Sequence, residues 1–302
     1  MKLSKELMLF SVVSIVFLAG CARGGVEPTG AGVIITSFAP DVQSVDAGSS
    51  VSFIVNLKNV GGKTSAVGRA LFFGLSNDWT FPTSGNPGIV PTLAAADPSL
   101  GLSGEEASID FVATIASTAA KNADVTYDAS VRVIYGYSTT VDTLLRFVKS
   151  DFLRTAPNTP KGIQSSTATA GPLLVTAAAR TPTLTSTATT GRVQFEIQNI
   201  GPGRVVKDMP TDGVVPANNL DIIKTIEITG VGETGKCAGT AVASGKVTLP
   251  DQRLAGGKSK VISCDVAVGD LTSFKDIALK VTITYSYFVD STTQVTVLKG
   301  LE

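Results

Sequence analysis

The sequence predicts an all-β protein built from two tandem immunoglobulin-like β-sandwiches. Three observations support this fold class. Short stretches of alternating apolar and polar residues recur along the chain, and Gly, Pro, Asn and Asp separate them, as is typical of strands and turns. The same order of stretches occurs twice. Helical periodicity is absent after the N-terminal segment, and about 120 residues per repeat suits seven or eight strands per sandwich.

The N-terminal segment has the pattern of an export signal that forms a helix. Lys2 and Lys5 precede an apolar stretch at 7–17, which is too short to span a bilayer comfortably. The next residues, Leu-Ala-Gly-Cys at 18–21, resemble the lipobox of prokaryotic lipoproteins. The resemblance implies cleavage before Cys21 and a diacylglyceryl group on its thiol. An ordinary signal peptide with a chance cysteine, or a short uncleaved anchor, is the alternative.

These features predict a lipoprotein signal peptide at 1–20 and a flexible tether at 21–32. The expected location is the extracytoplasmic face of the cell membrane, with the lipid on Cys21 as the membrane contact. No later stretch has eighteen apolar residues in a row, so we expect the remainder to be soluble.

An internal repeat organises the remainder of the chain. The stretches 51–62 and 193–203 alternate in the same phase and both end in an Asn-x-Gly turn. The two turns begin at Asn59 and Asn199, which are 140 residues apart. At the same spacing, the apolar stretch 33–36 falls on 173–176. Each repeat therefore opens with an apolar strand that leads to an alternating strand.

The repeats also end alike, in the motifs Tyr135-Gly-Tyr137 and Tyr285-Ser-Tyr287, which are 150 residues apart. Ser and Thr residues and a separate last strand follow each motif. Side chains two apart in a strand point the same way. The tyrosines therefore form either paired core rings whose hydroxyls meet the backbone, or an aromatic binding stripe. Their presence in both repeats favours the structural role.

The repeats predict one sandwich domain at 33–150 and a second at 171–300, each able to fold alone. The intervening segment 151–170 holds two prolines and many Ser and Thr residues, which is typical of an exposed, semi-extended linker.

The stretch 46–62, in which a Gly precedes an alternating strand that ends in Asn-Val-Gly-Gly, resembles the CARDB-type family of prokaryotic surface domains. In the second repeat the resemblance covers 191–203. It implies an immunoglobulin-like fold and a role in display, adhesion or assembly at the cell surface, with no catalytic residues to transfer.

Besides Cys21, the chain holds two cysteines, Cys237 and Cys264. An exported protein with two remaining thiols is expected to pair them, and Cys264 occupies a position like that of Phe111 in the first repeat. Two buried free thiols are the alternative. Without histidine, two cysteines cannot complete a zinc site unless carboxylates help, so we expect neither a metal nor a cofactor.

Composition narrows the function further. The chain has no His, which excludes Ser-His-Asp and Cys-His hydrolases, and its formal net charge of zero argues against a nucleic-acid partner. One loop carries Trp79 and Phe81, which either cap the open end of a sandwich or bind a sugar or protein partner. The capping role is favoured, and the pair is kept as the secondary, candidate binding site.

The leading hypothesis is therefore a lipid-anchored cell-surface protein that acts in adhesion, binding or display, with an unknown surface protein, extracellular protein or glycan as partner. The second hypothesis is a self-assembling subunit of a surface filament or coat, because low charge and sandwich edge strands permit self-association. An enzyme, such as a glycosidase with two carboxylates in a cleft, is the least favoured, and we predict that the protein is not an enzyme.

Overall fold

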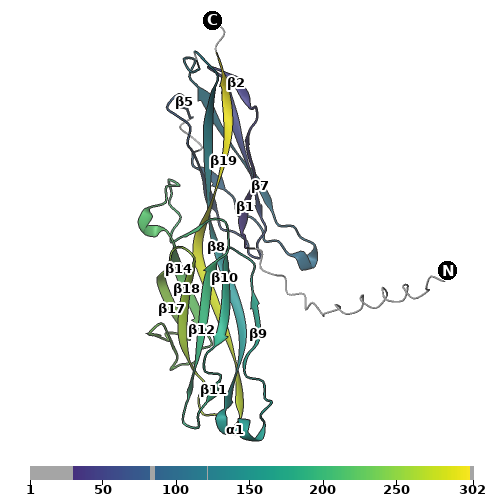
Figure 1. Cartoon of the computed structure of the whole chain (residues 1–302), viewed down its shortest axis with the longest axis vertical. Coiled ribbons are helices and arrows are strands. Elements are labelled where there is room, and N and C mark those ends of the chain that lie inside the picture. The colour runs from purple at the N-terminus through teal and green to yellow at the C-terminus, as the bar shows by residue number, and fades with distance from the viewer. Residues whose placement is uncertain (1–29, 82–85, 121, 300–302) are drawn as a thin grey trace, which may run out of the picture.

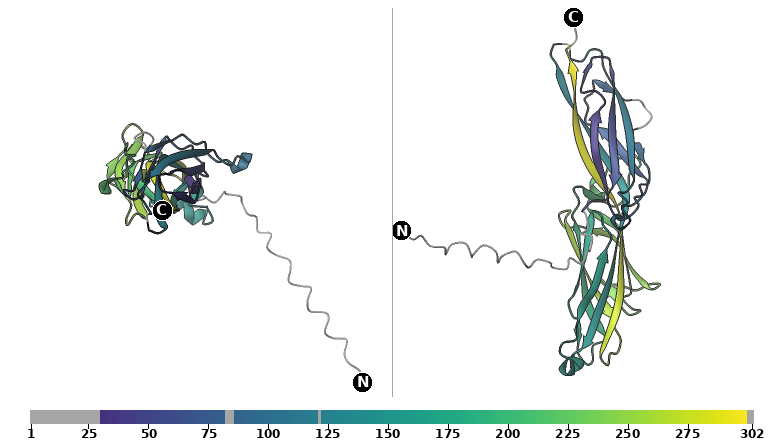
Figure 2. Two further views of the ribbon diagram at one scale, coloured as in Figure 1. Left: turned by 90° about the horizontal axis from the view of Figure 1, so that it is seen from above. Right: turned by 90° about the vertical axis from the view of Figure 1, so that its right-hand side faces the viewer.

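Two strands of 25 residues each, β8 (Val125–Lys149) and β19 (Phe274–Leu298), run along the whole molecule. In the computed structural model they pair antiparallel without interruption, from Val125 opposite Val297 to Val148 opposite Phe274. Strands in globular proteins usually have three to ten residues. Figure 1 shows the resulting elongated molecule, with β19 in yellow, and both views of Figure 2 confirm the shape. The structure describes residues 30–81, 86–120 and 122–299.

The upper half of the molecule in Figure 1 is built mainly from the first repeat. Its remaining elements are β1 (Val33–Pro40), β2 (Ser44–Asp46), β3 (Ser50–Asn59), β4 (Gly68–Phe73), β5 (Trp79–Thr80), β6 (Gly88–Val90), the 3₁₀ turn η1 (Pro98–Leu100) and β7 (Glu106–Ile115). A four-stranded sheet in the order β1-β3-β7-β5 packs there on a layer formed by β2, β19, β8, β4 and β6.

The lower half is built mainly from the second repeat. Its elements are α1 (Ser150–Thr155), β9 (Gly162–Ala168), β10 (Leu173–Ala179), β11 (Thr183–Leu184), β12 (Thr190–Asn199), β13 (Arg204–Val206), η2 (Ala217–Asn219), β14 (Ile222–Thr229), β15 (Lys236–Cys237), β16 (Thr240–Ala241), β17 (Lys246–Arg253) and β18 (Ser259–Ala267). A five-stranded sheet in the order β10-β12-β18-β15-β16 packs on a layer formed by β17, β14, β19, β8 and β9.

Both small sheets lie on the same side of the central sheet. Val131 and Val133 of β8 face the upper core, and Val141 and Leu145 face the lower core, all fully buried. These are odd-numbered positions of one uninterrupted strand, so their side chains share one face. We call this the inner face, and the opposite face of the ten-stranded central sheet the outer face. A single hydrophobic cluster on the inner face joins the two halves.

The prediction of an all-β protein with an internal repeat is confirmed. The repeats are related by a pseudo-twofold axis that passes between Gly136 and Ser286, which are 150 residues apart and directly opposite each other in the β8–β19 ladder. The correspondence extends to the small sheets, where Phe53 pairs with Phe111 and its equivalent Val193 pairs with Cys264.

The arrangement differs from the expected pair of self-contained domains at 33–150 and 171–300. The end of β8, from residue 138, supplies a strand to the lower half, and the end of β19, from residue 288, supplies one to the upper half. The Ser and Thr residues after each Tyr-x-Tyr motif do not break the strand. Thr favours extended backbone, and no Gly or Pro interrupts 138–149 or 288–298.

The segment 151–170 is also more structured than the linker that we expected. It forms the short helix α1 at the lower end and then returns as β9, which pairs antiparallel with β8 from Gly162 to Ala168. Because β8 continues to Lys149 at the far tip, the chain must reverse there, and the edge of β8 is the nearest partner for the backbone of the returning segment.

We predict that residues 171–302 do not fold alone, because β19 then lacks β8 along its full length. The fragment should give amide NMR shifts without dispersion, whereas residues 25–302 should give well-dispersed shifts. Addition of the complementary fragment 25–170 should restore the dispersion, because it returns the missing strand. A dispersed spectrum from 171–302 by itself would contradict the shared-strand architecture.

Candidate functional site

The middle of the molecule, which we call the waist, brings together the two sequence motifs of each repeat. Four tyrosines stand on the inner face of the central sheet around the pseudo-twofold axis. Tyr135 lies opposite Tyr287, with ring centroids 6.0 Å apart, and Tyr137 lies opposite Tyr285, at 6.2 Å. The rings are buried and form a continuous aromatic layer between the upper and lower cores.

The Asn-x-Gly turn of the second repeat closes onto one tyrosine hydroxyl. The Tyr287 hydroxyl donates a hydrogen bond to Asn199 Oδ1 at 3.0 Å and accepts one from the backbone N–H of Gly203 at 2.8 Å. Asn199 Nδ2 in turn donates to the carbonyl of Gly203 at 3.0 Å. The side chains thereby satisfy turn groups that have no strand partner.

In the first repeat, the equivalent residues Asn59 and Tyr137 form hydrogen bonds with a different set of partners. Tyr137 accepts a hydrogen bond from the backbone N–H of Lys63 at 3.1 Å and donates one to the carbonyl of Ala170 at 3.2 Å. The fully buried Asn59 donates to the carbonyls of Lys63 at 2.8 Å and Leu93 at 2.9 Å. Both turns need glycine here, since a Cβ on Gly61 would overlap the Tyr137 hydroxyl and one on Gly201 would meet that of Tyr287.

The other two tyrosines differ from each other in their hydrogen bonds. The hydroxyl of Tyr285 lies 2.9 Å from Thr139 Oγ1 in the buried core. The Tyr135 hydroxyl is also buried, close to the backbone of Val33, but it forms no well-directed hydrogen bond to any residue that the structure describes. The structural role predicted for the tyrosines is thus correct, although their hydroxyls do not all meet the backbone.

Burial also changes the acidity of these phenols. Loss of solvation raises the pKa of Tyr137 and of Tyr287 to about 12, although backbone donors oppose the shift. Burial raises the pKa of Tyr135 and of Tyr285 further above the ordinary value. The waist therefore favours the neutral, protonated form of all four tyrosines.

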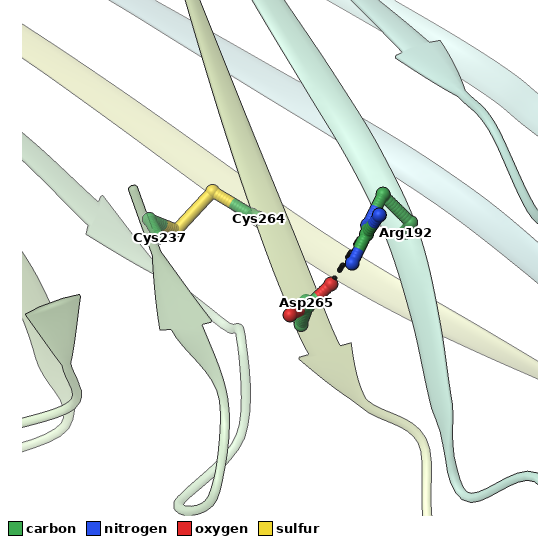
Figure 3. Close-up of a disulfide and its surroundings, with 4 residues drawn as sticks. All are labelled: Arg192, Cys237, Cys264 and Asp265. Atoms are coloured by element: carbon green, nitrogen blue, oxygen red, sulfur yellow. Dashed lines mark hydrogen bonds and ion pairs between the residues drawn. A yellow bond between two sulfur atoms is a disulfide. The ribbon is translucent and has the colours of Figure 1, made fainter. Parts of the chain in front are cut away.

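The predicted disulfide is confirmed: Cys237 in β15 is bonded to Cys264 in β18. The two residues face each other in adjacent antiparallel strands, and both are fully buried (Figure 3). The next residue, Asp265, points away from the core and pairs with Arg192, with Oδ1 2.9 Å from Nε. The bond links the short strand β15 covalently to its neighbour β18 within the lower small sheet.

Trp79 and Phe81 belong to the core of the upper half. Trp79 is 4% exposed, and its ring packs against Phe53 at 6.3 Å and Tyr127 at 5.7 Å. Phe81 is half-buried and packs edge-on against Phe72 at 5.3 Å. The candidate binding role is therefore wrong for Trp79, because its ring is not available to a ligand. The capping role accounts for both residues.

Cys21, the predicted lipid attachment residue, lies outside the described residues, as does the signal peptide at 1–20. None of the helices within the described ranges has the length and apolar character needed to span a bilayer. In the same ranges no three His, Cys, Asp or Glu side chains come together as a metal site.

The outer face of the central sheet carries two exposed grooves that the sequence did not reveal. The upper groove has a volume of about 590 Å³. Every side chain in it is polar: Gln43, Ser44, Thr126, Asp128, Thr292, Thr293, Gln294 and Thr296. Two cross-strand contacts order it, from Gln294 Nε2 to Asp128 Oδ1 at 2.8 Å and between the hydroxyls of Thr126 and Thr296 at 3.1 Å.

The lower groove, of about 380 Å³, is close to the pseudo-symmetry mate of the upper one. Asp142 and Leu144 occupy the positions that Thr292 and Gln294 hold above, 150 residues later. The chemistry differs, since the lower groove combines the charged Asp142 and Lys280 with apolar residues. Alternation of polar and apolar residues at 125–133 and 294–297 marks the face of the upper groove in the sequence, but the contribution of β2 does not follow from it.

Between the two grooves, the segment 207–221 covers the outer face at the waist. Its Met209, Val215 and Leu220 pack on a small apolar cluster that includes Ile134 and Phe288. Asp221 holds the end of the segment through two bonds to Arg204, the shorter of which is 2.6 Å. Beside this cover, Arg132 stacks over the Phe288 ring at 4.2 Å and pairs with Asp290.

We predict that Tyr287→Phe lowers the free energy of unfolding by about 1 kcal/mol or more, because the partly buried N–H of Gly203 loses its acceptor. Tyr135→Phe is the matched control. It removes a hydroxyl from the same cluster that has no hydrogen bond to a described residue, so its stability should be unchanged or slightly higher. Urea denaturation of residues 25–302 measures both, and equal losses would contradict the assignment.

A second prediction concerns pH. A tyrosine whose folded pKa is raised contributes stability that is complete below the unfolded pKa of about 10 and is lost as pH rises through the folded value. The folded pKa of Tyr137 and of Tyr287 is about 12. As pH rises from 10 to 12, each of them should therefore lower the free energy of unfolding by up to about 2–3 kcal/mol. Denaturation across this interval should show a steep loss, and the double variant Tyr137→Phe/Tyr287→Phe a shallower one. A wild-type curve as shallow as that of the double variant would refute the assignment.

Comparison with known proteins gives no family for this chain: no family model and no curated protein matches it. Among solved structures, it aligns with the transglutaminase of red sea bream at 9% identity and a TM-score of 0.17. The alignment covers 89% of this chain and 32% of the enzyme, so the chain spans about a third of that protein's length. Similarity at this level supports neither a shared fold nor a shared activity, and the CARDB-type resemblance stays a prediction.

Proposed function

We propose that the chain is a lipid-anchored cell-surface protein whose two halves are immunoglobulin-like sandwiches, each completed by a strand of the other, and that it acts in binding, adhesion or display. The observation that carries the proposal is the outer face, where two grooves present exposed hydroxyl, amide and charged groups from adjacent strands. The Leu-Ala-Gly-Cys motif at 18–21 supports attachment at the membrane.

The scaffold suits recognition because most groove residues stand on the two long strands β8 and β19, which pair with each other along their length. In the upper groove, β8 and β19 fix the backbone of Thr126, Asp128 and Gln294, so that their polar groups keep their relative positions. A partner that binds such a preorganised surface loses less conformational entropy than one that must order a loop. The polar, weakly charged chemistry suits a glycan or a polar protein surface.

Self-assembly through sheet edges is less favoured by the edge strands. The edge strand β17 carries Pro250, and register shifts interrupt β1 near Ser37 and β9 near Gln164. Pro and bulges are devices that protect a strand from pairing with another chain. The regular edge strand β10 has β9 packed beside it (Figure 1). These features favour display over a filament or coat.

Cys21→Ala should release the protein from the membrane fraction of cells that express the full chain, because the acyl chains provide the anchor. The matched control is the double variant Cys237→Ala/Cys264→Ala, which removes both other thiols and should stay with the membrane. Fractionation with labelled fatty acid measures both distribution and lipid content. Label that persists on the Cys21→Ala protein would refute the proposed attachment.

A further inference from the structure

The described chain begins at the waist and not at an end of the molecule. The carbonyl of Gly32 accepts a hydrogen bond from the backbone N–H of Val60 at 2.9 Å, in the first Asn-x-Gly turn. Gly30 contacts the equivalent turn, since a Cβ on Gly201 would lie only 2.8 Å from the Gly30 carbonyl oxygen. The N-terminal segment thus sits between the two repeats, beside the pseudo-twofold axis.

The position of this segment also shows on which face of the central sheet the chain enters the molecule. Gly32 packs against the hydroxyl of Tyr135 and the ring of Tyr137, which stand on the inner face. The chain therefore enters from the side that bears the two small sheets. The outer face, with its two grooves, lies on the opposite side of the central sheet.

Chain length then limits the possible orientations. Nine residue steps separate Cys21 from Gly30, and they span at most about 30 Å in any conformation. The 25 residues of β19 extend for about 80 Å, so the waist lies about 40 Å from either end of the molecule. A lipid on Cys21 therefore cannot reach the bilayer if the molecule stands upright on one end.

We infer that the protein is anchored at its middle, with its long axis close to the membrane plane, the small sheets towards the lipid and the two grooves facing outwards. The inference rests on the lipid attachment proposed above and adds the surface that meets a partner. Both grooves then lie at similar heights above the membrane, because the anchor is near the axis that relates them.

Energy transfer from single labels on the protein to an acceptor dye in the bilayer tests the orientation. The full, lipidated chain would be reconstituted into phosphatidylcholine–phosphatidylglycerol vesicles. Two exposed end positions receive donors, through Val125→Cys near the upper end and Asp151→Cys near the lower end. We expect similar transfer efficiencies at both. Strong transfer at one end and none at the other would show an upright molecule and overturn the inference.

A second pair of labels tests the side. Asp110→Cys lies on the exposed surface of the upper small sheet, and Thr292→Cys lies in the upper groove. Transfer should be stronger from position 110, and the reverse order would place the grooves against the lipid.

As a control on the reach argument, insertion of about twelve Gly and Ser residues after Arg23 lengthens the tether by about 40 Å. It should weaken transfer from all four positions and reduce the difference within each pair. Unchanged transfer would overturn the argument from reach.

The same labels on the Cys21→Ala background separate the two proposals. If the Cys21→Ala protein shows no transfer at any position, the lipid anchor is supported. If the lipidated protein then shows unequal transfer efficiencies at its two ends, the orientation is overturned and the anchor stays intact. Transfer that persists without Cys21 would overturn the lipid anchor, and the orientation derived from it as well.

Discussion

The pairing of β8 with β19 is the constraint on which the other features of the structure depend. The ladder is continuous from Val125 to Val148, so each strand leaves the repeat that encodes it and enters the other one. Parts of its outer edges pair with β4 and β9 on the β8 side and with β2, β13 and β14 on the β19 side. Neither sandwich is complete without residues from both repeats, and the paired strands supply the long axis of the molecule.

Such sharing creates a problem at the waist, where two hydrophobic cores must meet without a gap. The tyrosine layer solves it, because its rings bury apolar surface against both cores while the hydroxyls of Tyr137 and Tyr287 bond to the turns that end β3 and β12. Asn59 and Asn199 satisfy further turn carbonyls, and Gly61 and Gly201 leave room for the phenols. The two motifs lie some 80 residues apart in each repeat, yet they form one structural unit.

Much of the fold follows from local sequence pattern. Strand alternation, the repeat and the export context were enough to predict an all-β chain, the equivalence of Cys264 with Phe111 and the disulfide. Partner choice was not predictable, because the alternation at 138–149 is the same whichever half the strand joins. The Ser and Thr residues after Tyr137 were interpreted as separating two strands, although Thr fits an extended strand. The upper groove was missed because it joins β2, β8 and β19, which are distant in sequence.

The pseudo-twofold axis also connects the architecture to the proposed function. Duplication around Gly136 and Ser286 places two related grooves on one face. Both hold hydroxyls and an acid, Asp128 above and Asp142 below, but the upper groove adds amides, whereas the lower one adds Lys280 and apolar groups. The scaffold has therefore kept its geometry while the surface chemistry of the halves has diverged. Since the N-terminal segment enters beside the same axis, an anchor there favours neither groove. A protein held in this way can offer two different polar surfaces to partners at one height, which a chain tethered at its tip cannot do.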